Sequence, residues 1–261
     1  MDSVPSTEHE ASAGPRHDHG LLSSVREVII VALGILCAFG IDAWWNEVQE
    51  SETTRQSLVA LSVEFEANVD ALRSAQAAHL GIAEDGRALL HLTGPGADPA
   101  TISQAIGLIG ALWAPARSRL GSGALSALIA SGGLPRIDDP ELRRMLASWP
   151  DEASSLLRVE EASFATVRDL MQPRIGTFVP QMEAERVAGF HNIPEQRDIF
   201  IAGVPSSSAF GVDYGGLLGD LQFENSVVQR ITMSMVSANI IGSSTLPRSE
   251  AILSAINAEL E

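Results

Sequence analysis

The sequence contains no lysine. All 17 of its basic residues are arginines, and they face 33 Asp and Glu residues, so the formal net charge of the 261-residue chain is −16. A Walker A phosphate loop, Schiff-base chemistry, the Ser-x-x-Lys acyl-transfer motif and the protein kinase fold each require a lysine, and these classes are therefore excluded. The acidic balance also argues against nucleic acid as a partner, because such binding depends on basic patches that displace counterions from phosphates.

Cysteine and catalytic motifs are equally scarce. Cys37 is the single cysteine, which excludes an intramolecular disulfide and a multi-cysteine zinc site. No zincin, nucleophile-elbow or dinucleotide-binding fingerprint occurs in the chain. His9, His17 and His19 lie in a polar N-terminal segment that has too few apolar residues to fix a metal site. We therefore expect no catalytic residue, no metal and no cofactor, and interpret the chain as a non-enzyme.

One long uncharged run, residues 28–41, stands out against this polar background. Extended to Trp45 it has 18 residues, which as a helix cover about 27 Å, close to the ~30 Å hydrocarbon core of a bilayer. Asp42 can reach toward the headgroups, and Trp44 beside Trp45 is typical of a membrane-interface belt. We predict a transmembrane helix over residues 25–45. A cleaved signal peptide and a buried helix of a soluble domain are the alternatives.

An amphipathic pattern follows the apolar run. A seam of mostly apolar residues recurs with a period of 3.5 over about three heptads, at Leu58, Leu61, Phe65, Asn68, Leu72, Ala75 and His79. Within this seam Asn68 either fixes the register of a coiled-coil dimer or is tolerated in an intramolecular bundle. In the apolar run itself, Gly34 and Ala38 are four residues apart, as in a small-residue contact between membrane helices.

Turn and capping signals divide the rest of the chain into helices. Residues 93–99 carry Gly and Pro at nearly every second position and predict a break. Asp139 followed by Pro140 is a helix start, with the aspartate as N-cap and the proline in the first turn. Further helices are expected over 105–114, 124–130, 140–149, 151–171, 215–241 and 247–261, whereas 173–214 is broken by four prolines. No sustained alternation of period two is present, so strands are not indicated.

These segments predict an all-α fold in which one N-terminal transmembrane helix continues into a long amphipathic helix, followed by an α-helical bundle domain. The predicted organisation is a disordered cytoplasmic tail (1–24), the transmembrane helix (25–45), a coiled-coil-like amphipathic helix (46–92) and a helical bundle that packs with it (100–261).

Three blocks of sequence carry a resemblance to a known family. They are residues 26–50, with Gly34-Ile35-Leu36, Asp42, Trp45, Asn46 and Glu47; Ser131-Gly132-Gly133 followed by Asp139 to Arg144; and Leu217 to Asp220 with Phe223 and Asn225. In these blocks the chain resembles an uncharacterised bacterial family of single-span membrane proteins with a helical extracytoplasmic region. The resemblance implies a membrane anchor and supplies no catalytic residue. The absence of lysine departs from the usual composition of that family.

The arginines near the apolar run give its orientation. Arg16 and Arg26 precede it, whereas Arg55 alone follows it within about 20 residues. Because positive residues stay on the cytoplasmic side, this bias favours a cytoplasmic N-terminus and a C-terminal domain outside the cytoplasm. We therefore expect a single-pass protein of the bacterial inner membrane, with the lipid bilayer as one partner.

Four arginines are candidates for binding an anionic ligand. Arg117, Arg119, Arg143 and Arg144 lie in or next to the central resembling block, and guanidinium groups hold carboxylate or phosphate in bidentate fashion. The alternative is that they pair with Asp and Glu on neighbouring helices. The function that the sequence favours is interaction, either as a homo-oligomer or with another envelope protein. The alternatives are a helical ligand-sensing module and, third, a hydrolase whose residues meet only in space.

Overall fold

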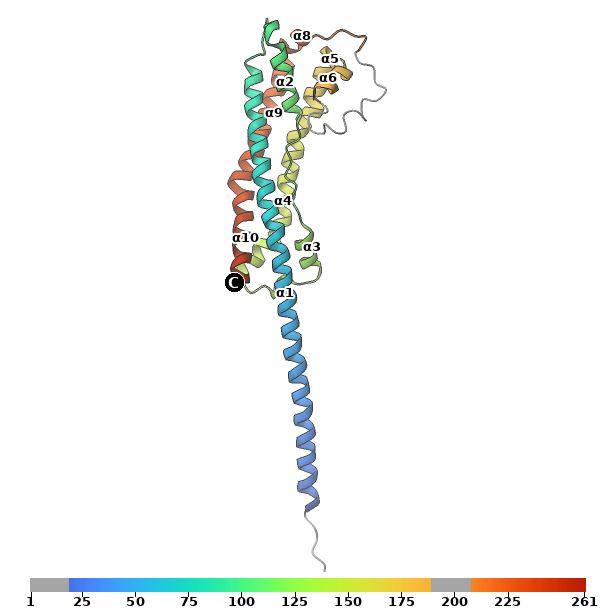
Figure 1. Cartoon of the computed structure of the whole chain (residues 1–261), viewed down its shortest axis with the longest axis vertical. Coiled ribbons are helices and arrows are strands. Elements are labelled where there is room, and N and C mark those ends of the chain that lie inside the picture. Colours follow the sequence, from blue (N-terminus) through green and yellow to red (C-terminus); the bar gives the residue numbers. More distant parts are fainter. Residues whose placement is uncertain (1–18, 189–207) are drawn as a thin grey trace, which may run out of the picture. The chain divides into compact units, whose positions relative to one another are not determined.

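The computed structural model (Figure 1) describes residues 19–188 and 208–261, and side chains over 30–184 and 208–261. All the regular structure in these residues is helical, so the protein is all-α, as the sequence predicts. The main helices are α1 His19–Leu90, α2 Ile102–Trp113, α3 Gly123–Ala130, α4 Pro140–Thr166, α5 Gln172–Phe178, α6 Gln181–Ala188, α8 Tyr214–Leu218, α9 Leu221–Ile240 and α10 Leu246–Leu260. Two π-helical turns, η3 Val167–Met171 and η5 Ile241–Thr245, and two 3₁₀ turns, η1 Pro99–Thr101 and η2 Leu134–Arg136, complete them. His9, His17, Arg16 and most of the predicted tail lie outside the described residues.

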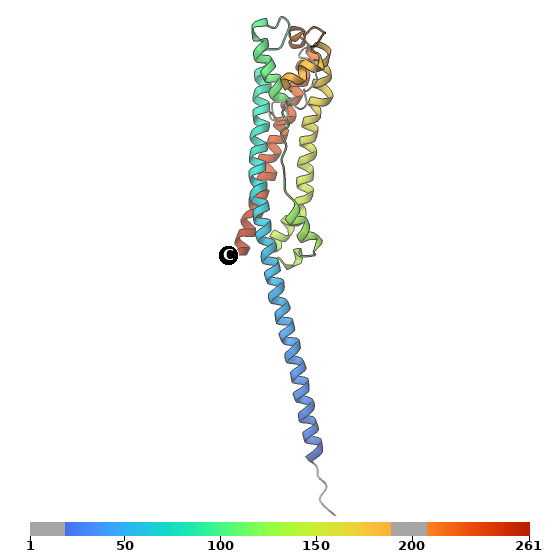
Figure 2. The same cartoon turned by 45° about the vertical axis from the view of Figure 1, so that its right-hand side comes forward.

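The chain divides into two units, residues 1–53 and residues 54–261, and the boundary falls within α1. In the first unit every described side chain, from Ile30 onward, is exposed. In the second, α1, α4 and α9 run side by side in both views of the cartoon (Figures 1 and 2). The second unit therefore holds the hydrophobic core of the described chain, whereas the first has none.

The predicted seam of α1 is buried in the second unit. Leu61, Phe65 and Leu72 have no exposed surface and pack in a core cluster with Trp149 of α4. The rings of Phe65 and Trp149 are 5.2 Å apart between centroids, within the range of favourable aromatic pairs. A second core cluster forms around Leu89 near the end of α1, together with residues of α2, α5, α8 and α9. The heptad pattern thus marks the buried face of α1 within one chain.

The helix expected up to residue 114 does end before Pro115, but two other prolines do not break a helix as the sequence predicts. A helix end at Pro150 is wrong, since α4 runs through it, and α4, η3 and α5 are contiguous from residue 140 to 178. The single helix expected over 215–241 is wrong, since Gly219 ends α8 and Asp220 caps the start of α9. Helix α9 is then joined to α10, expected over 247–261, through η5. A proline removes one N–H and crowds the carbonyl four residues earlier, and a π turn widens the ladder at that point. Pro173 and Pro247 each follow a π turn, which lets the helix continue.

Local signals elsewhere agree with the structure. Asp139 caps α4 by accepting a hydrogen bond from the backbone of Glu141. The predicted break after α1 contains Gly94 and Gly96 with φ of 129° and 79°, conformations that only glycine adopts at low cost. The stretch 173–214 contains the helices α5 and α6, and residues 189–207 of it lie outside the described part.

Candidate functional site

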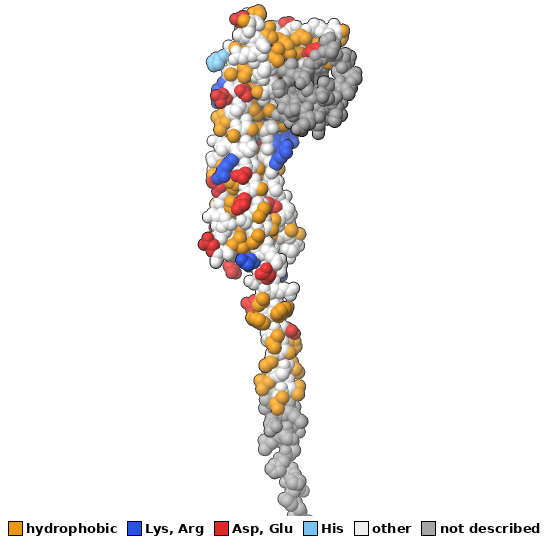
Figure 3. Space-filling model, viewed as in Figure 1, with side chains coloured by type: hydrophobic (Ala, Val, Ile, Leu, Met, Phe, Trp, Pro, Cys, Tyr) orange, Lys and Arg blue, Asp and Glu red, His pale blue; other side chains and the backbone are white. Residues whose placement is uncertain are grey.

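The apolar part of α1 presents large hydrophobic side chains to its surroundings. Leu36 is 65% exposed, Phe39 is 67% exposed and Trp45 is 62% exposed, and they belong to one continuous exposed apolar patch. Within the described residues this is the one helix long and apolar enough to cross a membrane, and none of that apolar window is buried. Hydrophobic side chains cover the described start of α1, whereas charged side chains are spread over residues 54–261 (Figure 3). An uncovered apolar surface of this size marks a membrane or protein contact.

The predicted interface and helix-contact residues lie on this exposed segment. Asp42, Trp44 and Trp45 are all exposed, and the two tryptophan rings are 6.5 Å apart between centroids. Gly34 has open space around it, since no atom would lie within 4 Å of an added Cβ, and Ala38 is exposed. These residues are therefore accessible to a bilayer or to another helix.

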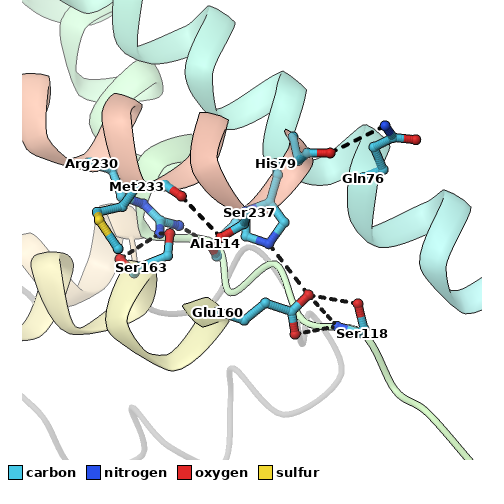
Figure 4. A network of polar contacts seen from close by, with 10 residues as sticks. Gln76, His79, Ala114, Ser118, Glu160, Ser163, Arg230, Met233 and Ser237 are labelled. Carbon is cyan, nitrogen blue, oxygen red and sulfur yellow. Dashed lines mark hydrogen bonds and ion pairs between the residues drawn. The ribbon is translucent and has the colours of Figure 1, made fainter. Parts of the chain in front are cut away.

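The second unit contains a buried polar cluster that is not among the sequence predictions (Figure 4). Its centre is Glu160 of α4, which is 1% exposed. The Glu160 carboxylate accepts the backbone N–H of Ser118, at 3.0 and 2.9 Å from its two oxygens, and the Ser118 hydroxyl at 2.7 Å. Ser118 belongs to the extended connector 114–122 between α2 and α3. Because this connector has no helical partners for its backbone, a buried carboxylate supplies an acceptor.

His79 of α1 lies beside this carboxylate. Its Nε2 is 3.6 Å from Glu160 Oε1, longer than a hydrogen bond, and its side chain is fully buried. Neither ring nitrogen has a hydrogen-bond partner among the described residues. His79 thus fills the seam at a contact between α1 and α4.

Arg230 of α9 holds the other end of the same connector. Its guanidinium donates to the carbonyl oxygens of Leu112, Ala114 and Ser163 at 3.2, 2.9 and 2.9 Å, and to the Ser163 hydroxyl at 2.9 Å. No carboxylate of the described residues forms an ion pair with it, and burial lowers the pKa of Arg230 to about 10. That value leaves the group charged at neutral pH, so a cation stabilised by neutral acceptors joins α9, α2 and α4.

Asn68 and Glu64 of α1 hold the end of the connector. The Asn68 side chain donates to the carbonyl of Gly121 at 3.0 Å and accepts its N–H at 2.6 Å. The Glu64 carboxylate accepts the backbone N–H groups of Ala124 and Leu125, at the start of α3. Asn68 is therefore used inside this chain, to position the connector against α1.

The chemistry of the cluster is that of a structural network. A serine nucleophile needs its hydroxyl next to a base and access to substrate, but the Ser118 hydroxyl donates to Glu160 and is buried. A sequence signal for part of the cluster exists: Glu160 occupies a core position of α4, four residues after buried Leu156 and three before buried Ser163. Its partners could not be found this way, because Ser118 lies in an irregular segment.

Three of the four candidate anion-binding arginines are exposed, and Arg143 is half-buried. Arg117 pairs with Glu161, which also contacts Arg168. Arg144 makes a bidentate contact with Glu141, one turn away in α4. Arg143 donates to the carbonyl of Ile137 at 2.6 Å. Arg119 is exposed and forms no ion pair with a described residue. Three of the four are thus engaged by acceptors on this chain.

Comparison with known proteins gives no relative: no protein-family model, no curated protein and no solved structure matches the chain. The family resemblance of the three sequence blocks therefore stays a prediction.

Proposed function

We propose that this protein is a single-pass component of the bacterial inner membrane that is anchored by α1 and acts through interactions of its helical unit. The observation that carries the proposal is the exposed apolar segment of residues 30–45. Transfer of a Leu, Ile or Phe side chain from water to an apolar environment is favourable by about 1.5–3 kcal/mol. A segment that exposes this many such side chains gains most when a bilayer covers it.

The interior of the helical unit favours an interaction role over the sensing of a ligand enclosed in the protein. An enclosed apolar space beside Trp113 and Tyr214 has a volume of only about 10 Å³. Ligand pockets have volumes of about 300–1,000 Å³. The larger hollows of this unit are open surface grooves, which suit a partner that docks from outside.

Membrane fractionation tests the anchor. The full chain is expected in the membrane pellet after an alkaline carbonate wash, which removes peripheral proteins. Replacing Leu36 and Phe39 together by Asp costs about 2.5–3.5 kcal/mol for each residue at the centre of a membrane helix, and we expect release into the supernatant. The matched control replaces Val59 and Val63, which are exposed on the helical unit, by Asp and should stay in the pellet. Wild-type protein in the carbonate supernatant would refute the anchor.

Topology and interaction are tested separately in cells. A C-terminal fusion to a phosphatase that is active only outside the cytoplasm should be active, and a fusion that works only in the cytoplasm would contradict the orientation. Crosslinking in intact membranes with mass spectrometry should recover either a homo-oligomer or a consistent envelope partner. A chain that crosslinks to neither would contradict the interaction role.

A further inference from the structure

A polar groove lies on the surface of the helical unit between α9 and the contiguous η3–α5 segment. It has a volume of about 450 Å³, within the range of small-ligand sites. One wall carries Gln222, Asn225 and Gln229 of α9, and the other includes Leu170 and Pro173. We call this feature the amide groove.

The three amide side chains form one row. They are spaced by three and four residues along α9, which places them on the same face of the helix. All three are exposed, and no described residue forms a hydrogen bond with their side chains. Each amide offers two donors and one acceptor oxygen. The row therefore presents both donors and acceptors to whatever lies in the groove.

The charged groups at the groove neutralise one another. The Arg174 guanidinium makes a bidentate contact with Asp220, with Nε 2.5 Å from Oδ1. This hydrogen bond lowers the pKa of Asp220 and holds it as a carboxylate. Asp169 is engaged in the same way by Arg168, at 2.8 and 3.2 Å. A charged ligand would have to displace these pairs, so the groove favours a neutral polar ligand.

The opposite wall adds apolar surface to this chemistry. Leu170 is 40% exposed and belongs to η3, and Pro173, which follows this π turn, is also exposed. Turns of this type occur frequently at functional sites. A sugar ring matches both walls, because its hydroxyl groups can pair with amides while its C–H face packs on aliphatic surface. We propose that the amide groove binds a neutral oligosaccharide.

A peptide fits the groove less well. Peptides are recognised by addition to a sheet edge, by an apolar groove that takes an amphipathic helix, or by an aromatic-lined groove that takes a polyproline segment. The described residues contain no strand, and the groove lining contains no aromatic residue. The inference rests on the proposed function in one respect: it names a glycan as the envelope component that the helical unit contacts.

Calorimetric titration of the full chain with the neutral β-1,4-linked N-acetylglucosamine tetramer tests the inference. The chain is held in a detergent without a sugar headgroup, so that the detergent does not compete. We expect saturable binding, and a loss of about tenfold or more in affinity when Asn225 and Gln229 are both replaced by Ala, because two hydrogen-bonding groups are removed. The control Gln104→Ala removes an exposed amide of α2 outside the groove and should leave the affinity unchanged.

Three results would overturn the inference. The first is that neither this tetramer nor neutral maltotetraose binds. The second is that the double variant binds with the affinity of the wild type. The third is that an uncharged decapeptide binds and the sugars do not. An unchanged circular dichroism melt of the double variant excludes misfolding as the cause of a loss. Carbonate fractionation does not depend on sugar binding, so a failed glycan site leaves the membrane anchor intact as a separate result.

Discussion

At the scale of single residues, the most unusual group is the guanidinium of Arg230. It is 1% exposed and is stabilised by three carbonyls and a hydroxyl. Burial of an ion is costly unless its hydrogen-bonding capacity is met, and here the free carbonyls at the end of α2 and in the connector meet it. The residue thus satisfies backbone groups that a helical bundle leaves unpaired.

Replacing Arg230 by Met should destabilise the helical unit by about 2–6 kcal/mol, because the carbonyls of Leu112 and Ala114 lose their donor, at about 1–3 kcal/mol each, whereas the Ser163 carbonyl still accepts from the Thr166 hydroxyl. Urea unfolding of the full chain, followed by circular dichroism, measures the change. Arg119→Met is the control, since Arg119 is exposed and forms no ion pair with a described residue, and should lie within about 0.5 kcal/mol of wild type. A tolerated Arg230→Met would show that water reaches these carbonyls.

The Arg174–Asp220 pair predicts a pH dependence. The hydrogen bond from Arg174 lowers the pKa of Asp220 in the folded chain, so the pair stabilises the fold above the unfolded value of about 3.9, and this contribution is lost as pH falls through the folded pKa. Asp220→Asn keeps a side-chain cap for α9 but removes the charge. We expect the stability gap between wild type and this variant to be largest at pH 7 and to close in acid. A gap that is constant from pH 7 to pH 3 would contradict the role of the charge.

At the scale of elements, close approach and irregular turns decide how the long helices pack. A Cβ placed on Gly86 of α1 would lie 2.5 Å from Cγ1 of Ile231 on α9, so these helices come together at a glycine. By contrast, no atom would lie within 4 Å of a Cβ on Gly81, one and a half turns earlier. One glycine is needed for packing and the other is not.

These two glycines give a matched pair of substitutions. Gly81→Ala should stabilise the chain by about 0.5–1 kcal/mol, because alanine has the higher helix propensity and nothing crowds it. Gly86→Ala should lose that gain, because Ile231 must move, and Gly86→Leu should destabilise by about 1–3 kcal/mol through overpacking. Thermal unfolding of the variants measures the order. Equal effects of alanine at the two positions would contradict the close contact of α1 with α9.

At the scale of the whole molecule, the chain separates one exposed apolar segment from one self-contained helical unit. Both core clusters consist of residues between Leu58 and Ile256, all of them in the second unit. A unit with its own hydrophobic core can fold alone. The described side chains of the first unit contribute to neither cluster.

Residues 54–261 expressed without the first 53 should therefore be soluble and should unfold in one cooperative transition. Size-exclusion chromatography and calorimetry measure these properties. The same fragment should fail to sediment with lipid vesicles, whereas the full chain should sediment. An aggregated fragment without a transition would mean that residues 1–53 take part in the fold.

Much of this fold is local in origin and could be predicted. The α1 seam follows from a repeat of 3.5 residues, the start of α4 from the capping chemistry of Asp139, and the break after α1 from Gly94 and Gly96. The continuation of helices past prolines could not be predicted, because a proline signals only a lost hydrogen bond. Helix α4 tolerates Pro150 without a π turn, whereas a π turn precedes Pro173 and Pro247.

The sequence by itself determined the helical class, the buried face of α1, the absence of lysine-dependent chemistry and the apolar segment that a membrane would cover. Only the tertiary structure decided that Glu160, Ser118 and Arg230 meet, that Asn68 serves a connector in its own chain, and that three amides of α9 line a groove. The physical reason is the separation along the sequence over which each kind of interaction acts. Periodicity and capping act over a few residues, whereas Glu160 and Ser118 are 42 residues apart in sequence and Arg230 lies 116 residues from its acceptor Ala114. Which of many polar residues become partners depends on how the helices pack, and that is settled only when the whole core forms.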